Sequence, residues 1–272
     1  MIIYQPKGRA REYSPLAANF YQGCDHGCIY CYVPRIFRMD RQKFRESVTP
    51  KESIISRLKD EIKKWKDPKE QVLLCFTGDP YCRTEMKQSI TLSALPILLQ
   101  AGFPVAILTK GGSRCLRDLD IFKQYKDQIK VGATLTFIEE KDTKEFEPYS
   151  ARPWERMETL ARLHQNGIRT WASFEPVIHP DQTIELLNQT LEYVDEYKIG
   201  KINQFQNLDK GIDWNAFLRK VVKILRDQDK DFYVKQDLRE QAKDVWLSQK
   251  EKDMNALTLV APLQQIRQLS LE

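Results

Sequence analysis

The chain has 272 residues, a formal net charge of +5 at neutral pH, and 42% hydrophobic and 30% charged residues. This balance is typical of a soluble globular protein and excludes a fibrous or disordered chain. No segment has the roughly 18 consecutive apolar residues that a membrane-spanning helix needs. The basic N-terminus is not followed by the apolar stretch of a secretory signal. We therefore expect a cytoplasmic protein without a membrane segment.

The first 50 residues carry eight Lys and Arg against four Asp and Glu, so they hold most of the net charge. Within them, the basic side chains from Arg35 to Arg45 alternate with Phe37 and Phe44. Cations interleaved with aromatic rings can grip a nucleic-acid strand, although an exposed basic loop without a ligand has the same pattern. The charge favours an anionic substrate or nucleic acid as the partner.

Apolar runs and helical periodicities alternate along the chain almost to its end. Strands are predicted at 16–21, 72–76, 104–109, 131–137, 168–174, 197–203 and 232–235. Helices are predicted at 53–65, 84–100, 114–127, 154–164, 180–194, 214–225 and from Asp237 onward. This alternation predicts an α/β fold with a parallel sheet and helices outside it.

Six or seven strand–helix units are fewer than the eight of a complete TIM-type barrel, which typically takes about 250 residues. The sequence therefore predicts an incomplete (β/α)6–7 barrel. We expect a single domain over residues 1–272, with its core at about 15–236 and a C-terminal helix and tail at 237–272. In such a fold, the active groups lie at the carboxyl ends of the strands.

Three of the six cysteines lie within eight residues, in the segment GCDHGCIYCY. Cys24, Cys28 and Cys31 have the spacing C-x3-C-x2-C and follow the first predicted strand. Structural zinc takes four ligands, usually in two pairs. Here a zinc site would need His26 or a distant cysteine as its fourth ligand. Three close thiolates suit a [4Fe–4S] cluster whose fourth iron lacks a cysteine.

With an aromatic residue before its last cysteine, this motif resembles that of the radical S-adenosylmethionine (SAM) superfamily. The fuller segment is similar to spore photoproduct lyases within that superfamily, and the likeness covers roughly residues 15–180. Further segments that carry it are Phe76 to Pro80 (FTGDP), Leu108 to Lys110 (LTK), Ala133 to Thr136 (ATLT), and Glu147-Pro148 with Arg156 beyond.

The resemblance implies an enzyme that uses a [4Fe–4S] cluster and SAM. The open iron would chelate the amino and carboxylate groups of SAM. An electron, delivered by a donor such as flavodoxin or ferredoxin, would cleave SAM to methionine and a 5′-deoxyadenosyl radical. This radical would abstract a hydrogen atom from a substrate, and the family likeness together with the basic N-terminal region favours DNA or a nucleotide.

The loops after the second and third strands supply candidate SAM contacts. Asp79 follows a buried strand, where its carboxylate could accept hydrogen bonds from an ammonium group or a ribose, although an Asp-Pro pair also starts turns. Thr77 and Gly78 share that loop. Lys110 could pair with the carboxylate of SAM, or extend to solvent as a surface lysine. Tyr30, inside the cysteine motif, is placed near the adenine.

Three further contacts come from the next two strands. Thr134 and Thr136 lie two residues apart, so both side chains point to one face of a strand. Their hydroxyl groups need partners, which either SAM or the backbone could provide. Glu175 ends the fifth strand and could contact a ribose or the substrate, or cap a neighbouring helix.

Two residues are candidates for the substrate step. Spore photoproduct lyases have a hydrogen-donor cysteine directly before the T-x-D segment; here that position is Phe76, and Cys75 comes one residue earlier. A one-residue slip along a strand turns a side chain to the opposite face, so Cys75 is expected to face away as a small core residue. Tyr32 could cover the cluster or stack on a base. Weaker candidates at the last two strand ends are Asn203, Gln204, Lys235 and Gln236.

Two other functions stay open. One is a radical SAM enzyme that acts on a small metabolite or peptide, which would consume SAM without responding to DNA. The other is a non-catalytic Fe–S or zinc protein that binds nucleic acid, which would hold metal without turning over SAM.

Overall fold

The computed structural model describes residues 1–66, 68–202, 205 and 208–260. Its centre is an eight-stranded sheet in the order β1-β2-β5-β6-β7-β8-β9-β10, in which β1 is antiparallel to β2 and all other neighbours are parallel. The strands are β1 (Ile3–Tyr4), β2 (Leu16–Ala18), β5 (Val72–Leu74), β6 (Val105–Thr109), β7 (Ile129–Thr134), β8 (Arg169–Val177), β9 (Glu196–Lys201) and β10 (Asp231–Val234). A second, small sheet pairs β3 (Tyr21–Gln22) with β4 (Thr49–Pro50).

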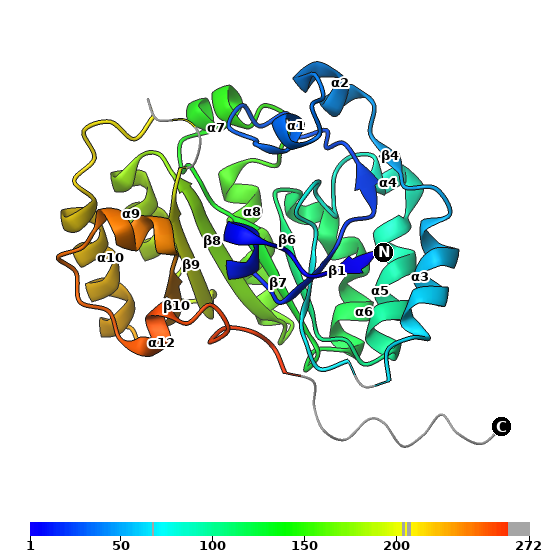
Figure 1. Cartoon of the computed structure of the whole chain (residues 1–272). Helices are drawn as coiled ribbons and strands as arrows, with labels where there is room; N and C mark the ends of the chain where they lie inside the picture. The colour runs from blue at the N-terminus through cyan, green and yellow to red at the C-terminus, as the bar shows by residue number, and fades with distance from the viewer. Residues whose placement is uncertain (67, 203–204, 206–207, 261–272) are drawn as a thin grey trace.

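Helices cover the outer side of the curved sheet, and the N-terminal segment, dark blue in Figure 1, crosses its inner side. The helices of the described residues, including η1 of the N-terminal segment and α1 and α2 beside the cysteine loop, are η1 (Gly8–Glu12), α1 (Val33–Ile36), α2 (Arg41–Glu46), α3 (Ile54–Ile62), α4 (Glu85–Gln88), α5 (Ile90–Gln100), η2 (Gly112–Asp118), α6 (Leu119–Gln124), α7 (Glu140–Phe146), α8 (Pro153–Gln165), α9 (Pro180–Thr190), α10 (Trp214–Asp227), α11 (Gln236–Gln241) and α12 (Gln249–Lys252). Among the described residues, no helix has the length and apolar character to cross a membrane.

The seven parallel strands and their covering helices confirm the predicted α/β fold with an incomplete barrel. In the sheet order, β1 and β10 are the two edges, so a seam separates them in the part of the chain that the structure describes. Two predicted helices are divided. A left-handed Ser89 (φ +52°) separates α4 from α5, and the helix predicted at 114–127 begins as the 3-10 helix η2.

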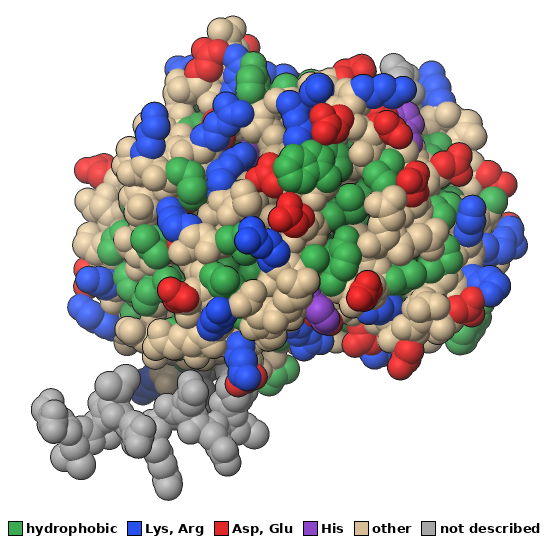
Figure 2. Space-filling model, turned by 180° about the vertical axis from the view of Figure 1, so that it is seen from behind, with side chains coloured by type: hydrophobic (Ala, Val, Ile, Leu, Met, Phe, Trp, Pro, Cys, Tyr) green, Lys and Arg blue, Asp and Glu red, His purple; other side chains and the backbone are tan. Residues whose placement is uncertain are grey.

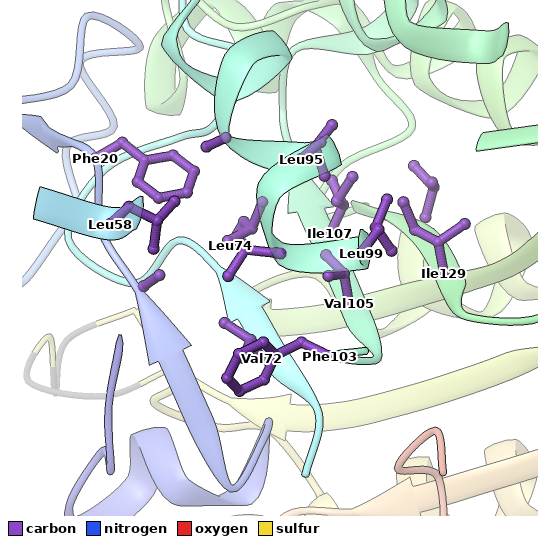
Figure 3. Packing of buried hydrophobic residues seen from close by; sticks show 14 of the residues in the cluster. Phe20, Leu58, Val72, Leu74, Leu95, Leu99, Phe103, Val105, Ile107 and Ile129 are labelled. Atoms are coloured by element: carbon purple, nitrogen blue, oxygen red, sulfur yellow. The ribbon is translucent and has the colours of Figure 1, made fainter. Parts of the chain in front are cut away.

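The apolar residues form two main clusters between the sheet and its helices. In the first, Leu95 and Leu99 of α5 pack on Leu74, Val105 and Ile107, as Figure 3 shows. In the second, α9 and α10 pack on β8, β9 and β10. Strands that are buried on both faces need continuous apolar runs, and β5 (VLL) is fully buried.

The inner side of the sheet is filled at its centre by Trp171 of β8. Its Nε1 donates to the carbonyl of Ile107 at 2.9 Å. A Cβ added to Gly132 of β7 would lie 2.5 Å from that Nε1, so the indole takes the space that a side chain there would need. The large ring closes the middle of the barrel and leaves the carboxyl ends of the strands open.

The far end of the barrel, at the amino ends of the strands, is covered by the C-terminal segment. Leu257 and Leu259 are buried there, and Lys130 of β7 donates to the carbonyl of Leu257. The same ammonium group lies 2.5 Å from a carboxylate oxygen of the buried Glu196. The Oε1 of Gln71 accepts from the backbone of Leu259 at 3.0 Å.

Candidate active site

The candidate site is a cavity of about 540 Å³ at the carboxyl ends of the parallel strands. It brings together nearly all the side chains that the sequence analysis selected. These are Cys24, Cys28, Tyr30, Cys31, Tyr32, Cys75, Thr77, Gly78, Asp79, Lys110, Thr134 and Glu175. Their gathering follows from the topology, because parallel strands end at one edge of a sheet.

The cysteine loop between β3 and α1 is held in place by groups from distant segments. The carboxylate of Asp25 accepts from the backbone of Arg83 at 3.0 Å and of Thr84 at 2.9 Å. The backbone of Ile29 donates to the carbonyl of Phe146 at 2.9 Å. From α2, the guanidinium of Arg41 donates to the carbonyls of Cys28 and Cys31, at 3.4 and 2.9 Å.

Gly27 lets the cysteine loop pass close to its neighbours. Its φ is +68°, a left-handed value that favours glycine, and an added Cβ would lie 2.9 Å from the ring of Tyr149. Arg45 lies on that ring, with its Cζ 4.9 Å from the ring centre. Any larger residue at position 27 would therefore push the loop away from this aromatic–cation contact.

The three thiols lie between two cavities. A second cavity, of about 320 Å³, also has Cys24, Cys28 and Cys31 in its wall, together with Arg41 and Arg45 of α2 among others. The thiols can thus be approached from the side of α2 as well as from the cavity at the strand ends.

The donor set fits a cluster held by three thiolates. Burial raises the pKa of Cys28 to about 12 and also raises that of Cys24. Such thiols lose their protons at neutral pH when a metal replaces them. Within the described residues, no three or more His, Cys, Asp or Glu side chains are grouped for a single ion. A cluster instead needs one thiolate per iron, and three cysteines on one loop provide that.

Asp79 is bound on all sides by the protein. Its Oδ1 accepts from the hydroxyl of Thr109 at 2.6 Å and from the backbone of Tyr81 at 2.8 Å. Its Oδ2 accepts from the backbone of Lys110 at 2.7 Å and lies 3.1 Å from Nε2 of His26. The bond to Tyr81 is the turn-forming contact that an Asp-Pro pair predicts, and the other three join this loop to β6 and to the cysteine loop.

Behind the cysteine loop lies a buried network around Glu147. Its carboxylate accepts from Arg156 of α8 and from the hydroxyl of Tyr30, and from Thr136 at 3.2 Å. The ammonium of Lys110 lies 3.9 Å away. Burial alone would raise the pKa of Glu147, but the cations Arg156 and Lys110 and these hydrogen bonds lower it. The carboxylate is thus ionised at neutral pH.

The threonines and the glycine that the sequence analysis selected have different neighbours in the structure. Thr134 lines the cavity, whereas Thr136 bonds to Glu147 and is absent from the wall among the described residues. The backbone of Thr77 donates to Asn19 at 2.9 Å. A Cβ on Gly78 would lie 3.0 Å from the carbonyl of Gly23, so the two loops meet there.

Cys75 packs on the first apolar cluster, as expected of a small core residue, but it also lines the cavity that it was expected to face away from. The expectation assumed a strand through Phe76, but β5 ends at Leu74, and strand alternation no longer applies beyond it. Cys75 and Phe76 both line the cavity. Burial raises the pKa of the Cys75 thiol to about 12, so its S–H bond is intact at neutral pH.

Glu175 binds a lysine rather than capping a helix. Lys235, which follows β10, lies with its Nζ 2.8 Å from both carboxylate oxygens, and the hydroxyl of Tyr13 donates to the same group. Lys235 is only 2% exposed and lines the cavity. Two other candidates at the strand ends, Asn203 and Gln204, lie outside the described residues.

The sequence left two interpretations of the basic and aromatic segment after the cysteines, a nucleic-acid contact or an exposed basic loop, and its two aromatic residues differ in exposure. Phe44 is buried against the cysteine loop, and only Phe37 is exposed, at 47%. Arg41 is engaged with the loop carbonyls. Figure 2, the view from behind, shows Lys and Arg interspersed with Asp and Glu.

Sequence reasoning missed the N-terminal wall of the cavity. Tyr4, Lys7, Arg9 and Tyr13 line it, as does Lys201 from the end of β9. None of these residues belongs to a recognisable motif, and the basic composition of the first residues was the one available signal. Tyr4 is placed by β2 and Asn19, whereas Tyr13 is placed by Lys198 of β9.

Comparison with protein families gives one match, to the model of the Radical SAM superfamily over residues 18–194. An uncharacterized protein of Methanocaldococcus jannaschii is 30% identical over 190 residues, which are 70% of this chain and 66% of that protein. An uncharacterized protein of Mycobacterium tuberculosis is 25% identical over 166 residues, 59% of this chain and 48% of that one. The chain thus spans about half to two thirds of the length of these relatives.

Solved structures share the fold. A spore photoproduct lyase complexed with dinucleoside spore photoproduct has a TM-score of 0.62 at 11% identity, covering 85% of this chain and 78% of that one. Streptococcus suis SuiB bound to its precursor peptide SuiA has a TM-score of 0.61 at 14% identity, covering 85% of this chain and 52% of that one. At these identities the likeness concerns architecture alone.

Proposed function

The chain belongs to the radical SAM superfamily, and from this premise we propose that it abstracts hydrogen from a nucleic-acid or nucleotide substrate. Members of this superfamily are enzymes with a [4Fe–4S] cluster and SAM as cofactors. The one observation that carries the choice of substrate is the charge of the cavity wall. In the part of the chain that the structure describes, five cationic side chains line the cavity, against the two carboxylates of Asp79 and Glu175.

Neither carboxylate offers a free charge to a ligand. Asp79 is surrounded by Tyr81, Thr109, Lys110 and His26, and Glu175 is held by Lys235 and Tyr13. Two of the cations are paired as well, Lys235 with Glu175 and Lys201 with Asp209, at 2.8 and 2.9 Å. The positive charge that the wall presents therefore comes from Lys7, Arg9 and Lys110, and it favours an anionic ligand. Aromatic rings in the same wall, Tyr4 and Tyr32 among them, suit the flat base of a nucleotide.

Cys24, Cys28 and Cys31 are the residues we assign to the cluster, and Lys110 to the carboxylate of SAM. Loaded with both cofactors, the site supplies the one-electron cleavage of SAM to methionine and the 5′-deoxyadenosyl radical that takes hydrogen from the substrate. Lys110 fits its role because its side chain is 15% exposed and lines the cavity, and because Glu147, its ion-pair partner among the described residues, is 3.9 Å away. Tyr30 lies under this ammonium, 5.6 Å from the ring centre, where it shields the group from solvent.

The other loops form the remaining cofactor wall in this proposal. Thr77, Gly78 and Thr134 border the cavity between the thiols and β7, where the adenosyl part of SAM would lie. Asp79 acts by holding its loop, Thr136 by fixing Glu147, and Glu175 by placing Lys235. Cys75 carries an S–H hydrogen on the cavity wall, and Tyr32 covers the same space from the side of the cysteine loop.

The cluster also needs an electron, and the second cavity offers a route to the thiols apart from the substrate cavity. Residues 35–46 beside it carry five Lys and Arg against two Asp and Glu. Charge complementarity therefore favours an acidic electron carrier such as a flavodoxin or a ferredoxin at this surface.

The proposed function is tested by anaerobic turnover. Reconstituted protein is reduced with dithionite, given SAM, and assayed for 5′-deoxyadenosine, with Cys28→Ala as the control. We expect 5′-deoxyadenosine from the wild type alone, and a faster rate when plain or irradiated DNA is added. Cleavage by Cys28→Ala at the wild-type rate would overturn the cluster assignment. Wild-type cleavage that DNA and nucleotides leave unchanged would overturn the substrate assignment and favour a peptide or small metabolite.

A further inference from the structure

The substrate half of the cavity is built from residues outside the superfamily's matched region. The match covers 18–194, whereas Lys7, Arg9 and Tyr13 precede it and Lys201 and Lys235 follow it. All five line the cavity. The cysteine loop and the loops after β5, β6 and β7 lie inside the matched region and face the same space. The chain thus adds a wall of its own to a shared cofactor site.

The N-terminal segment crosses the seam of the open sheet and is fixed at both ends. At its start, the backbones of Ile2 and Ile3 donate to Glu61 of α3 at 2.7 and 2.8 Å, and β1 pairs with β2. The side chain of Asn19 donates to the hydroxyl of Tyr4 at 2.6 Å. These contacts place the start of the segment at one edge of the sheet.

At its other end, the segment is bound to the opposite edge. Lys198 of β9, 2% exposed, donates to the carbonyls of Glu12 and Tyr13 at 2.8 and 3.0 Å. The carboxylate of Glu12 accepts from the hydroxyl of Tyr233 at 2.7 Å and from the backbone of Gln236 at 2.8 Å. Because both ends are anchored, the residues between them form a fixed wall.

The 3-10 helix η1 aligns three residues of this wall in one row. A 3-10 helix has three residues per turn, so residues three apart lie above one another. Lys7, Ala10 and Tyr13 have this spacing, flank or belong to η1, and line the cavity. Ala10 is small, so space remains between the ammonium of Lys7 and the ring of Tyr13.

The two cations of the η1 segment, Lys7 and Arg9, are exposed and line the cavity. Lys7 is exposed and makes no hydrogen bond or ion pair with any described residue, and Arg9 is 57% exposed, with its Nε 3.9 Å from Asp237. Resting on the proposed function, we infer that η1 is the substrate-recognition element and that Lys7 and Arg9 bind the phosphate groups of a single nucleic-acid strand. Phosphate binding by such side chains is electrostatic and falls with salt.

The test compares two labelled oligonucleotides by fluorescence anisotropy. Cluster-loaded protein with SAM, without reductant, is titrated with a phosphodiester thymidine 12-mer and with its uncharged methylphosphonate analogue. We expect the wild type to bind the phosphodiester at least tenfold more tightly. Lys7→Ala should lower the salt slope of log K by about 0.7, the value for one phosphate of a single strand, and Lys7→Glu should weaken binding at least tenfold.

The matched control is Lys59→Glu, which makes the same charge change on the exposed side of α3, away from the cavity wall. It should bind within twofold of the wild type. Three outcomes would each overturn the inference. The wild type could bind both oligonucleotides equally or bind neither, or Lys7→Glu and Lys59→Glu could lose the same affinity for the phosphodiester. This measurement needs no turnover, so it fails or succeeds independently of the 5′-deoxyadenosine assay that tests the proposed function.

Discussion

The imidazole Nε2 of His26 lies 3.1 Å from the Oδ2 of Asp79, with both side chains buried. His26 stands between the first two cysteines of the motif, and Asp79 stands in the loop after β5. The contact therefore ties the segment that we assign to the cluster to the segment that borders the proposed SAM site. Because the same carboxylate is bonded to Thr109 and to the backbone of Lys110, three loops share one anion.

Asp79→Asn should lower stability by about 2–3 kcal/mol, because an amide has a single acceptor oxygen and leaves buried donors unsatisfied. The measurement is urea unfolding of the metal-free, reduced protein. Asp120→Asn, on the exposed first turn of α6, is the control and should change stability by less than about 0.5 kcal/mol. Equal losses in the two variants would show that the Asp79 network does not hold the loops together.

The ion pair of Glu147 with Arg156 predicts a specific pH dependence. The pKa of Glu147 is lowered in the folded protein, so its stabilisation is present above the unfolded pKa of about 4.3. It is lost as the pH falls through the folded pKa. Glu147→Gln should lower the free energy of unfolding by about 3 kcal/mol at pH 7, because it leaves the buried Arg156 unpaired.

In unfolding experiments on the metal-free protein, the difference in the free energy of unfolding between the wild type and Glu147→Gln should decrease steadily below about pH 4. Glu158→Gln, an exposed change on α8, serves as the reference and should show no such decrease. A difference that stays constant down to pH 3 would contradict the ionised pair.

Cys75→Ala should keep its iron and cleave SAM at a rate within about threefold of the wild type. The reason is that Cys75 belongs to the loop after β5 and not to the cysteine loop, although it lines the same cavity. The assay is 5′-deoxyadenosine formation under dithionite, with iron content measured on the same samples. Loss of cleavage with full iron content would show that this thiol takes part in the cofactor step.

The proposed electron route predicts a dependence on the reductant. Arg38→Glu and Lys43→Glu, both exposed beside the second cavity, should slow SAM cleavage several-fold when flavodoxin is the donor at low salt. They should leave the dithionite-driven rate unchanged, because a small reductant needs no docking surface. With flavodoxin, the difference in cleavage rate between these variants and the wild type should decrease at high salt, where surface charges are screened. The same loss with both reductants would refute the docking surface.

Local motifs made it predictable that the candidate cofactor residues gather at one end of the sheet. The thiols at 24, 28 and 31, the TGDP loop and Lys110 are each defined by neighbouring residues and by a position at a strand end, which hydrophobic patterning reveals. The structure places them around one cavity. The overall fold was predictable for the same reason, because each strand–helix unit carries its own periodicity.

Contacts between distant segments could not be predicted in this way. The orientation of Cys75 depended on β5 ending at Leu74, two residues earlier than its apolar run. The aromatic side chain of Phe44 looked exposed in a basic segment and proved to be packed under the cysteine loop. The wall formed by Lys7 and Tyr13 is held by Lys198, which lies 186 residues after Glu12, so no local sequence pattern predicts it.

The anchors of the N-terminal segment also set an order for folding as the chain is synthesised. The partners of the cysteine loop, from Phe44 to Tyr149, are made before residue 150. The partners of Glu12 are Lys198, Tyr233 and Gln236, which lie 186 to 224 residues further along the chain. Closing so long a loop is slow and carries an entropic cost. The cysteine loop and its partners can thus fold during synthesis. The contacts of Glu12 form only after the last strands are made, so this wall is the last part of the cavity to form.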